Sequence, residues 1–175
     1  GTFQPAVNLP VAKGPIGVAI ADVNKDNKPD VVVTNSLTDQ VSLLLGNGNG
    51  SFQNAVAFTV GSGGTPVQGF FPSYVSLADL NADGNLDLLV ANNNTSSIAL
   101  LTGDGKGGFS KPVNLSVGRT PVAVLGGDFN RDGLDDLAMG CPGRDLGATV
   151  EGGGVLDAGR VIVLNGSSLG LTSLG

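Results

Sequence analysis

The stretch DLNADGNLD, residues 79–87, has two close copies in the same chain, DVNKDNKPD at residues 22–30 and DFNRDGLDD at residues 128–136. All three have the form D-x-N-x-D-x-x-x-D. A short apolar stretch precedes each copy and another follows it immediately, and apolar runs of this length beside turn-forming residues are typical of β-strands. We therefore predict that each acidic segment is a loop that joins two neighbouring strands.

Each acidic loop belongs to a longer repeat with four predicted strands. A third apolar segment follows the loop in every unit, and in the first two units a glycine-rich turn (GNGNG, residues 46–50; GDGKGG, residues 103–108) leads to a fourth extended segment. Residues 2–11, TFQPAVNLPV, match that fourth segment, so the chain is expected to begin within a repeat. The predicted strands lie at residues 16–21, 31–33, 41–45 and 51–60, at 74–78, 88–91, 98–101 and 109–117, and at 122–125, 137–139 and 161–164.

The spacing of the loops indicates stacked repeats. Their first residues are 57 and then 49 positions apart, and a longer connection at residues 61–72 accounts for the difference. Four short antiparallel strands in a repeat of about 50 residues are typical of β-propeller blades; a β-solenoid, the main alternative, usually has a shorter period. We predict an all-β chain with an orphan outer strand at residues 1–13 and blades at residues 14–61, 62–118 and 119–175.

The composition of the 175 residues restricts the possible chemistry. The chain has no His and one Cys, Cys141, so it cannot build a Ser-His-Asp triad, a Cys-His pair or an imidazole zinc site by itself. A formal charge of −6 argues against nucleic acid as a partner. No apolar run approaches the roughly 20 residues of a membrane span, so we expect no membrane insertion. We expect Cys141 to be a small core residue.

The acidic loops carry hard oxygen donors. Positions 1, 3, 5 and 9 supply carboxylate or amide oxygens, and position 7 can turn its backbone carbonyl inward, which is the kind of ligand set that Ca²⁺ prefers. An EF-hand is excluded because position 12 is Val33, Val90 or Met139 rather than an acid. The alternative interpretation, that Asp, Asn and Gly only form turns, explains one such loop better than three matching ones.

The sequence also resembles a known family. The third unit, with AMGCPGRD at residues 138–145 and DAGRVIVLNGSSLGLTS at residues 157–173, resembles the FG-GAP repeats of integrin α-subunit propellers. The first two units, with GNGNGSFQNAV and GDGKGGFSKPV, resemble the related VCBS-type repeats of bacterial surface proteins. The resemblance implies a seven-bladed propeller with three Ca²⁺ sites in this part. The ligands that it implies are Asp22, Asn24, Asp26, the backbone oxygen of Lys28 and Asp30; Asp79, Asn81, Asp83, the backbone oxygen of Asn85 and Asp87; and Asp128, Asn130, Asp132, the backbone oxygen of Leu134 and Asp136.

The first loop departs from the other two at position 6. Asn27 stands where the others have Gly84 and Gly133. Because Asn also tolerates positive φ, we expect this site to persist but to bind Ca²⁺ more weakly. Phe3, Phe52 and Phe109 recur at the start of the outer strand, which indicates packing between repeats.

Three blades leave sheet faces uncovered, so we expect further blades of a longer chain, or a second copy that contributes residues 2–11, to close the ring.

We predict structural Ca²⁺ in an extracellular or cell-surface module that binds protein or glycan, since extracellular calcium fills even weak sites. The alternative is the propeller portion of a secreted enzyme such as a polysaccharide lyase or phosphoesterase, although the obvious acid pairs are committed to metal. The segment 141–160 is either a ligand loop or a solvated insertion, and it contains Arg144, Asp145, Glu151 and Asp157.

Overall fold

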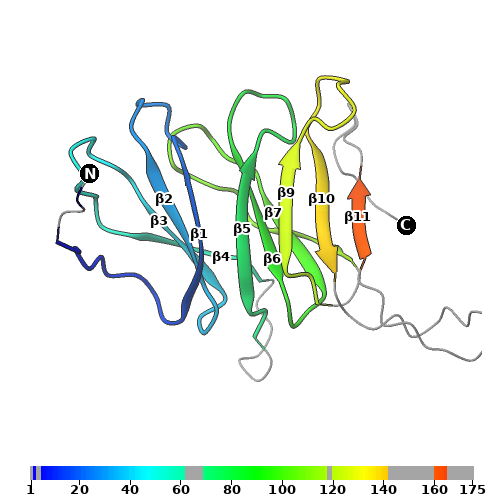
Figure 1. The fold of residues 1–175 in the computed structure, drawn as a ribbon, viewed down its shortest axis with the longest axis horizontal. Helices are drawn as coiled ribbons and strands as arrows, with labels where there is room; N and C mark the ends of the chain where they lie inside the picture. The colour runs from blue at the N-terminus through cyan, green and yellow to red at the C-terminus, as the bar shows by residue number, and fades with distance from the viewer. Residues whose placement is uncertain (1, 3–4, 62–68, 118–119, 142–159, 165–175) are drawn as a thin grey trace, which may run out of the picture.

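The computed structural model describes residues 2, 5–61, 69–117, 120–141 and 160–164 (Figure 1). In this part of the chain all regular structure is β, and no helix is long and apolar enough to cross a membrane. The strands are β1 (Pro15–Ala21), β2 (Asp30–Asn35), β3 (Gln40–Leu44) and β4 (Val56–Thr59); β5 (Pro72–Ala78), β6 (Asp87–Asn92), β7 (Ser97–Leu101) and β8 (Val113–Ser116); and β9 (Ala123–Gly127), β10 (Asp136–Cys141) and β11 (Arg160–Leu164).

The strands form three separate antiparallel sheets, one for each repeat. The first two sheets have the orders β1-β2-β3-β4 and β5-β6-β7-β8, and the third has the order β9-β10-β11 within the described residues. Each sheet is a meander in which consecutive strands pair. We call the sheets blade 1, blade 2 and blade 3.

The blades stack face to face, and strand β6 shows why. Successive side chains of a strand point to opposite faces of its sheet. Leu88 and Val90 therefore lie in the hydrophobic cluster between blades 1 and 2, whereas Leu89 and Ala91 lie in the cluster between blades 2 and 3. All four side chains are fully buried. Since burial of one Leu side chain contributes roughly 1.5–3 kcal/mol, stacking on both faces is the main source of stability for a small sheet.

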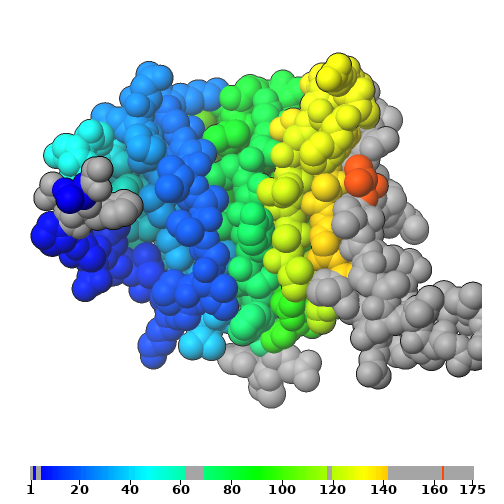
Figure 2. All heavy atoms as spheres, in the orientation of Figure 1, coloured from blue at the N-terminus to red at the C-terminus, as the bar shows by residue number. Residues whose placement is uncertain are grey.

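The inner strands of the blades are neighbours. Strand β5 contacts β1 on one side and β9 on the other, and the three strands run side by side in Figure 1. In the space-filling view of Figure 2 the repeats accordingly form adjacent blue, green and yellow bands. Inner strand beside inner strand, with sheets stacked face to face, is the arrangement of propeller blades. The prediction of an all-β chain made of four-stranded antiparallel blades is thus confirmed, while the total number of blades stays a prediction.

The fourth strands are shorter than predicted. We expected strands over residues 51–60 and 109–117, but β4 begins at Val56 and β8 at Val113. The residues just before them fold back instead, because Phe52 and Phe109 form isolated bridges with Gly46 and Gly103. The predicted packing role of Phe109 is confirmed, since its ring meets that of Phe58 edge-on with centroids 5.2 Å apart.

Residues 5–14, which precede β1, contain no strand. They are held to blade 1 by a buried amide: in the orientation that satisfies its surroundings, Asn35 donates to the carbonyl of Ala12 (3.1 Å) and accepts from Ser42 Oγ (2.9 Å). The equivalent residue of blade 2, Asn92, donates to the carbonyl of Val60 at the end of the preceding blade (3.3 Å). Ala12 thus stands where Val60 stands in the next repeat, but the strand predicted over residues 1–13 is not formed in its described part, residues 5–13, because no neighbouring strand pairs with it there.

Candidate metal sites

The three acidic loops lie at the same end of the blades. They connect β1 to β2, β5 to β6 and β9 to β10, and in Figure 1 they form the upper edge of the molecule. The first residue of each outgoing strand is the ninth residue of a loop, namely Asp30, Asp87 or Asp136. The repeat thus places three equivalent sets of acidic side chains along one edge.

The second loop shows how its side chains fold the backbone. Asp79 Oδ1 and Asn81 Oδ1 both accept from the backbone N–H of Asp83, at 3.1 and 3.0 Å. Asp79 Oδ2 accepts from Gly84 N at 2.8 Å, and Asp83 Oδ1 accepts from Asn85 N at 2.7 Å. Side-chain oxygens at positions 1, 3 and 5 therefore accept bonds from the backbone N–H groups of positions 5, 6 and 7.

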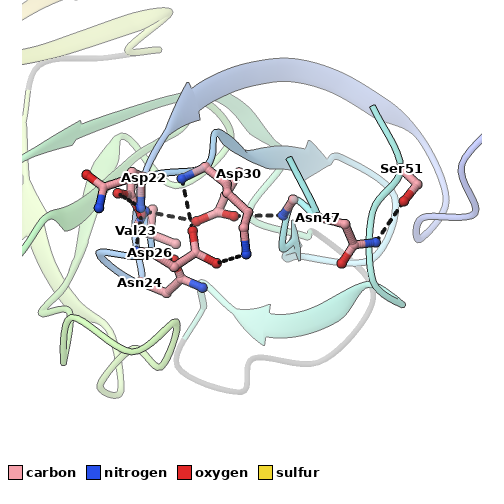
Figure 3. A network of polar contacts seen from close by, with 10 residues as sticks. Asp22, Val23, Asn24, Asp26, Asp30, Asn47 and Ser51 are labelled. Carbon is pink, nitrogen blue, oxygen red and sulfur yellow. Dashed lines mark hydrogen bonds and ion pairs between the residues drawn. The ribbon is translucent and has the colours of Figure 1, made fainter. Parts of the chain in front are cut away.

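The first loop has the same bonds (Figure 3). Asp26 N donates to Asp22 Oδ1 and to Asn24 Oδ1, at 3.1 and 3.2 Å. Asn27 N donates to Asp22 Oδ2 at 2.7 Å, and Lys28 N donates to Asp26 Oδ1 at 3.0 Å. One contact has no counterpart in the second loop: the ammonium of Lys28 lies 3.2 Å from Asp26 Oδ2 and forms an ion pair with it.

The third loop repeats the pattern again. Asp132 N donates to Asp128 Oδ1 and to Asn130 Oδ1, at 3.2 and 2.8 Å. Gly133 N donates to Asp128 Oδ2 at 3.0 Å, and Leu134 N donates to Asp132 Oδ1 at 2.9 Å. Three sequences that share only positions 1, 3, 5 and 9 thus adopt one hydrogen-bonded conformation.

Two residues of each loop adopt left-handed backbone conformations. Position 6 was expected to do so, and Asn27 has a φ of 61° where Gly84 and Gly133 have 81° and 87°, which confirms that Asn substitutes for Gly there. Position 4 also has positive φ, although none of its residues is glycine. This second left-handed position could not be predicted from the sequence, because its three residues share no chemical type: Lys25 (60°), Ala82 (56°) and Arg131 (65°).

The ninth residue ties the loop to the sheet. Asp87 is buried, and its two carboxylate oxygens accept from Leu80 N in the loop (3.0 Å) and from Gly103 N after β7 (2.9 Å). A Cβ atom on Gly103 would overlap the carbonyl oxygen of Leu86, so only glycine fits this close approach. The other blades show the same bonds, from Val23 N and Gly46 N to Asp30, and from Phe129 N to Asp136.

The electrostatics of the second loop differ between its exposed and buried acids. The hydrogen bond from Asn85 N, with help from Asn81 and from the charge of Lys25, lowers the pKa of exposed Asp83. Burial raises the pKa of Asp87, and the negative charges of Asp83 and Asp79 add to this. In the first loop partial burial opposes the shift, but hydrogen bonds from Lys28 and Asn24 lower the pKa of Asp26. A cation beside the second loop would relieve the repulsion around Asp87.

Neighbouring loops touch one another. Asp135 Oδ2, from the third loop, accepts from Asp79 N of the second loop at 3.0 Å. On the other side, Lys25 of the first loop extends towards Gly84 of the second. The sequence analysis did not identify Asp135 or Lys25, since neither belongs to the shared acidic pattern. Only the stacking of the blades brings each of them next to the second loop.

The donor set fits Ca²⁺ by its chemistry. Positions 1, 3, 5 and 9 supply hard oxygens, and a carboxylate oxygen that accepts one N–H bond keeps a further lone pair for a metal. In the described residues no three acidic or Cys side chains gather as a ready-made metal cluster, because the carboxylates are turned towards backbone N–H groups. In the structure, the residues at position 7 donate a backbone N–H bond to the carboxylate at position 5; these residues are Lys28, Asn85 and Leu134. The predicted ligand role of all fifteen residues stays a prediction.

Other predicted features lie elsewhere. Cys141 is buried in the cluster between blades 2 and 3, which confirms its predicted role as a core residue. Residues 142–159, with Arg144, Asp145, Glu151 and Asp157, lie outside the described residues, as does Phe3.

The stacked blades and their matching acidic loops define a repeat protein of the β-propeller class. The FG-GAP-like repeat model matches residues 22–90 and 79–139, and the FG-GAP repeat model matches residues 120–164. The chain belongs to the FG-GAP repeat family.

Similar proteins include integrin α subunits. Integrin alpha-3 of Mus musculus is 30% identical over 129 residues, and that of Cricetulus griseus is 33% identical over 129 residues. Each alignment covers 63% of this chain, which spans 12% of the length of these relatives. Among solved structures, one of TcdB2-TccC3-Cdc42 aligns with 70% of this chain and 6% of its own, at 23% identity and a TM-score of 0.44.

Proposed function

We propose that this chain is a calcium-binding propeller module, in which one structural Ca²⁺ binds at each acidic loop and stabilises the stacked blades. When bound, the ion would neutralise the loop carboxylates and cross-link the two ends of each loop. The residues that would hold it are those at positions 1, 3, 5, 7 and 9 of the three loops. Full loading would bring the formal charge of −6 to zero.

The observation that best supports this proposal is the recurrence of one loop geometry in three blades. In every copy the carboxylate at position 1 accepts from the N–H groups of positions 5 and 6, and the Asn at position 3 accepts from position 5. A simple turn needs one such side chain, not four oxygen-bearing ones. The surplus of negative charge is explained if a divalent cation binds there.

The first loop is the weakest of the three candidate sites. Its Lys28 ammonium already pairs with Asp26 Oδ2 at 3.2 Å, so a metal would have to displace a positive charge from one of its own ligands. The second and third loops carry Asn85 and Leu134 at that position. We therefore infer two stronger sites and one weaker site.

We further propose that the module acts outside the cell and binds protein or glycan rather than catalysing a reaction. Extracellular calcium, at about millimolar concentration, would fill even weak loops, whereas cytosolic calcium would not. Similarity to integrin alpha-3 agrees with a binding role. Loops on the rigid blades would supply the contact surface, because binding residues are often found on loops that a rigid scaffold positions.

Calorimetric titration tests the proposed metal sites. CaCl₂ added to EGTA-treated protein should report three bound ions, and the double variant D79N/D83N should report two. The matched control is D104N: Asp104 is an exposed acid that also accepts two backbone N–H bonds, from Lys106 and Gly108, but it lies in the glycine turn outside the acidic loops. D104N should still bind three ions.

Thermal unfolding tests the structural role. Free Ca²⁺ at 100 times the dissociation constant should add roughly 2.7 kcal/mol for each site to the free energy of unfolding. The unfolding midpoint should therefore fall when EGTA is added. Binding without any change in the midpoint would contradict the structural role, and the absence of binding heat together with an unchanged midpoint would contradict the sites themselves.

A further inference from the structure

A lysine of the first acidic loop ends beside the second loop. Lys25 is the fourth residue of its loop and is exposed. A Cβ atom on Gly84 would lie 3.8 Å from Lys25 Nζ, and a Cβ atom on Gly105 would lie 3.5 Å from Lys25 Cε. Gly84 is the sixth residue of the second loop, and Gly105 belongs to the glycine-rich turn of the same blade. The side chain of Lys25 therefore crosses from blade 1 to blade 2.

The ammonium of Lys25 brings a positive charge to the acids of the second loop. The hydrogen bond from Asn85 N is the main cause of the lowered pKa of Asp83, and the charge of Lys25 contributes to it. Opposite charges favour the ionised form of a carboxylate. In the first loop, the ammonium of Lys28 lies 3.2 Å from Asp26 Oδ2. Each of these two loops thus has a lysine charge that acts on its fifth residue.

The residue at position 4 decides whether a loop can send a charge to its neighbour. Ala82 occupies this position in the second loop, and its φ of 56° is close to the 60° of Lys25. Alanine has no charged group that could reach the third loop. The second and third loops therefore share one set of oxygen donors but differ in the charge that the preceding loop supplies.

We propose that Lys25 is a tethered cation of the second loop, which offsets the charge of the loop acids and competes with Ca²⁺ for them. This proposal rests on the proposed function, because it concerns the metal site at the second loop. Like charges repel, so the ammonium opposes a divalent ion at the same acids. The second loop should then bind Ca²⁺ more weakly than its oxygen donors alone would, and its stability should depend less on the ion.

Calorimetric titration of EGTA-treated protein with CaCl₂ at low ionic strength tests this competition. K25M should bind one of its three ions about fivefold more tightly, because a unit charge beside a divalent ion has been removed. At about 1 M KCl, where the Debye length is about 3 Å, the difference should largely disappear. The matched control is K13M, which should bind Ca²⁺ as the wild type does. Lys13 is also exposed, but it precedes β1, and its carbonyl accepts from Leu37 N at the opposite end of blade 1.

A second background shows on which loop Lys25 acts, since this residue also belongs to the first loop. The variant D79N/D83N lacks the second site. Addition of K25M to this variant should leave the affinity of the remaining sites unchanged. Tighter binding in this background, or a difference that persists at high salt, would overturn the proposal.

Thermal unfolding gives a readout that a merely structural role would not produce. In EGTA at low ionic strength, K25M should unfold about 1–2 °C below the wild type, because an attraction between exposed charges is lost. Saturating Ca²⁺ should remove this deficit, because K25M binds the ion more tightly. A deficit that persists in calcium would show that Lys25 only packs against the glycine-rich turn, and it would overturn the proposal.

The failure of this proposal can be distinguished from the failure of the proposed function. A wild-type protein that gives no binding heat contradicts the metal sites and this proposal together. If the wild type and K25M bind three ions with equal affinity, only this proposal is overturned.

Discussion

Replacement of Gly103 by Ala is expected to damage the junction between an acidic loop and its sheet. Gly103 follows β7, and its N–H donates to the buried carboxylate of Asp87 at 2.9 Å. A Cβ atom at this position would overlap the carbonyl oxygen of Leu86, which is backbone and cannot rotate away. The glycine must therefore move by roughly 1 Å to reach an ordinary carbon–oxygen contact.

The expected cost follows from two terms. Forcing an extra methyl group into a packed site costs about 1–3 kcal/mol. The movement also stretches the bond between Gly103 N and Asp87, and a hydrogen bond to a charged acceptor contributes about 1.5–3 kcal/mol. We expect a loss of about 3–5 kcal/mol, a large part of the 5–15 kcal/mol that stabilises a typical domain.

Urea unfolding followed by far-ultraviolet circular dichroism measures this loss. With a typical slope of about 2 kcal/mol per molar urea, the midpoint should fall by about 2 M. The control is G127A, since a Cβ on Gly127 would meet only the ring of Phe129, at an ordinary distance of 3.6 Å. If G103A and G127A unfold within about 0.5 kcal/mol of each other, the close approach does not stabilise the loop and the reasoning is wrong.

Two further changes test contacts that the structure revealed. D135A should lower the free energy of unfolding by about 1 kcal/mol, because the N–H of Asp79 in the neighbouring loop loses its acceptor; urea unfolding measures this, and D135N, which keeps an acceptor oxygen, should cost less. A99S should raise the free energy of unfolding by about 1 kcal/mol. Asn92 Oδ1 is buried without a hydrogen-bond partner in the described structure, and a hydroxyl at position 99 can donate to it. Ser42 occupies the equivalent position of blade 1, since it pairs with Val33 as Ala99 pairs with Val90. A destabilised A99S would show that the added oxygen does not reach the amide.

The blade architecture could be predicted from the sequence because it depends on a repeated local pattern. Each sheet has apolar runs separated by turn-forming residues, and the acidic loop marks the same turn in every unit. The lengths of the fourth strands could not be predicted, since Phe52 and Phe109 look like strand residues but pair back across a glycine turn. Whether an apolar residue extends a strand or closes a turn depends on tertiary contacts that no local pattern records.

The sequence predicted the oxygen-bearing side chains of the acidic loops, but not the glycines and the contacts between blades that hold these loops in place. The pattern identified the oxygen donors at positions 1, 3, 5 and 9, because their spacing repeats. The glycines that close the loop left a weaker signal: Gly46 and Gly103 each follow the ninth Asp by sixteen residues. The contacts of Asp135 and Lys25 left no signal in the sequence, since they depend on how one blade is placed against the next.

The hydrogen bonds of the loops also bear on what calcium would add under the proposed function. The carboxylates at positions 1 and 9 accept bonds from N–H groups of the loop, and we expect these bonds to hold the loop conformation beside any bound ion. A bound ion would offset repulsion between acids, such as the effect of Asp79 and Asp83 on buried Asp87. Removal of calcium should therefore lower the unfolding midpoint while the circular dichroism spectrum of the native protein stays unchanged. A β spectrum that disappears in EGTA at 25 °C would show that the loops depend on the metal for their conformation, and that their backbone bonds alone are too weak to hold the blades.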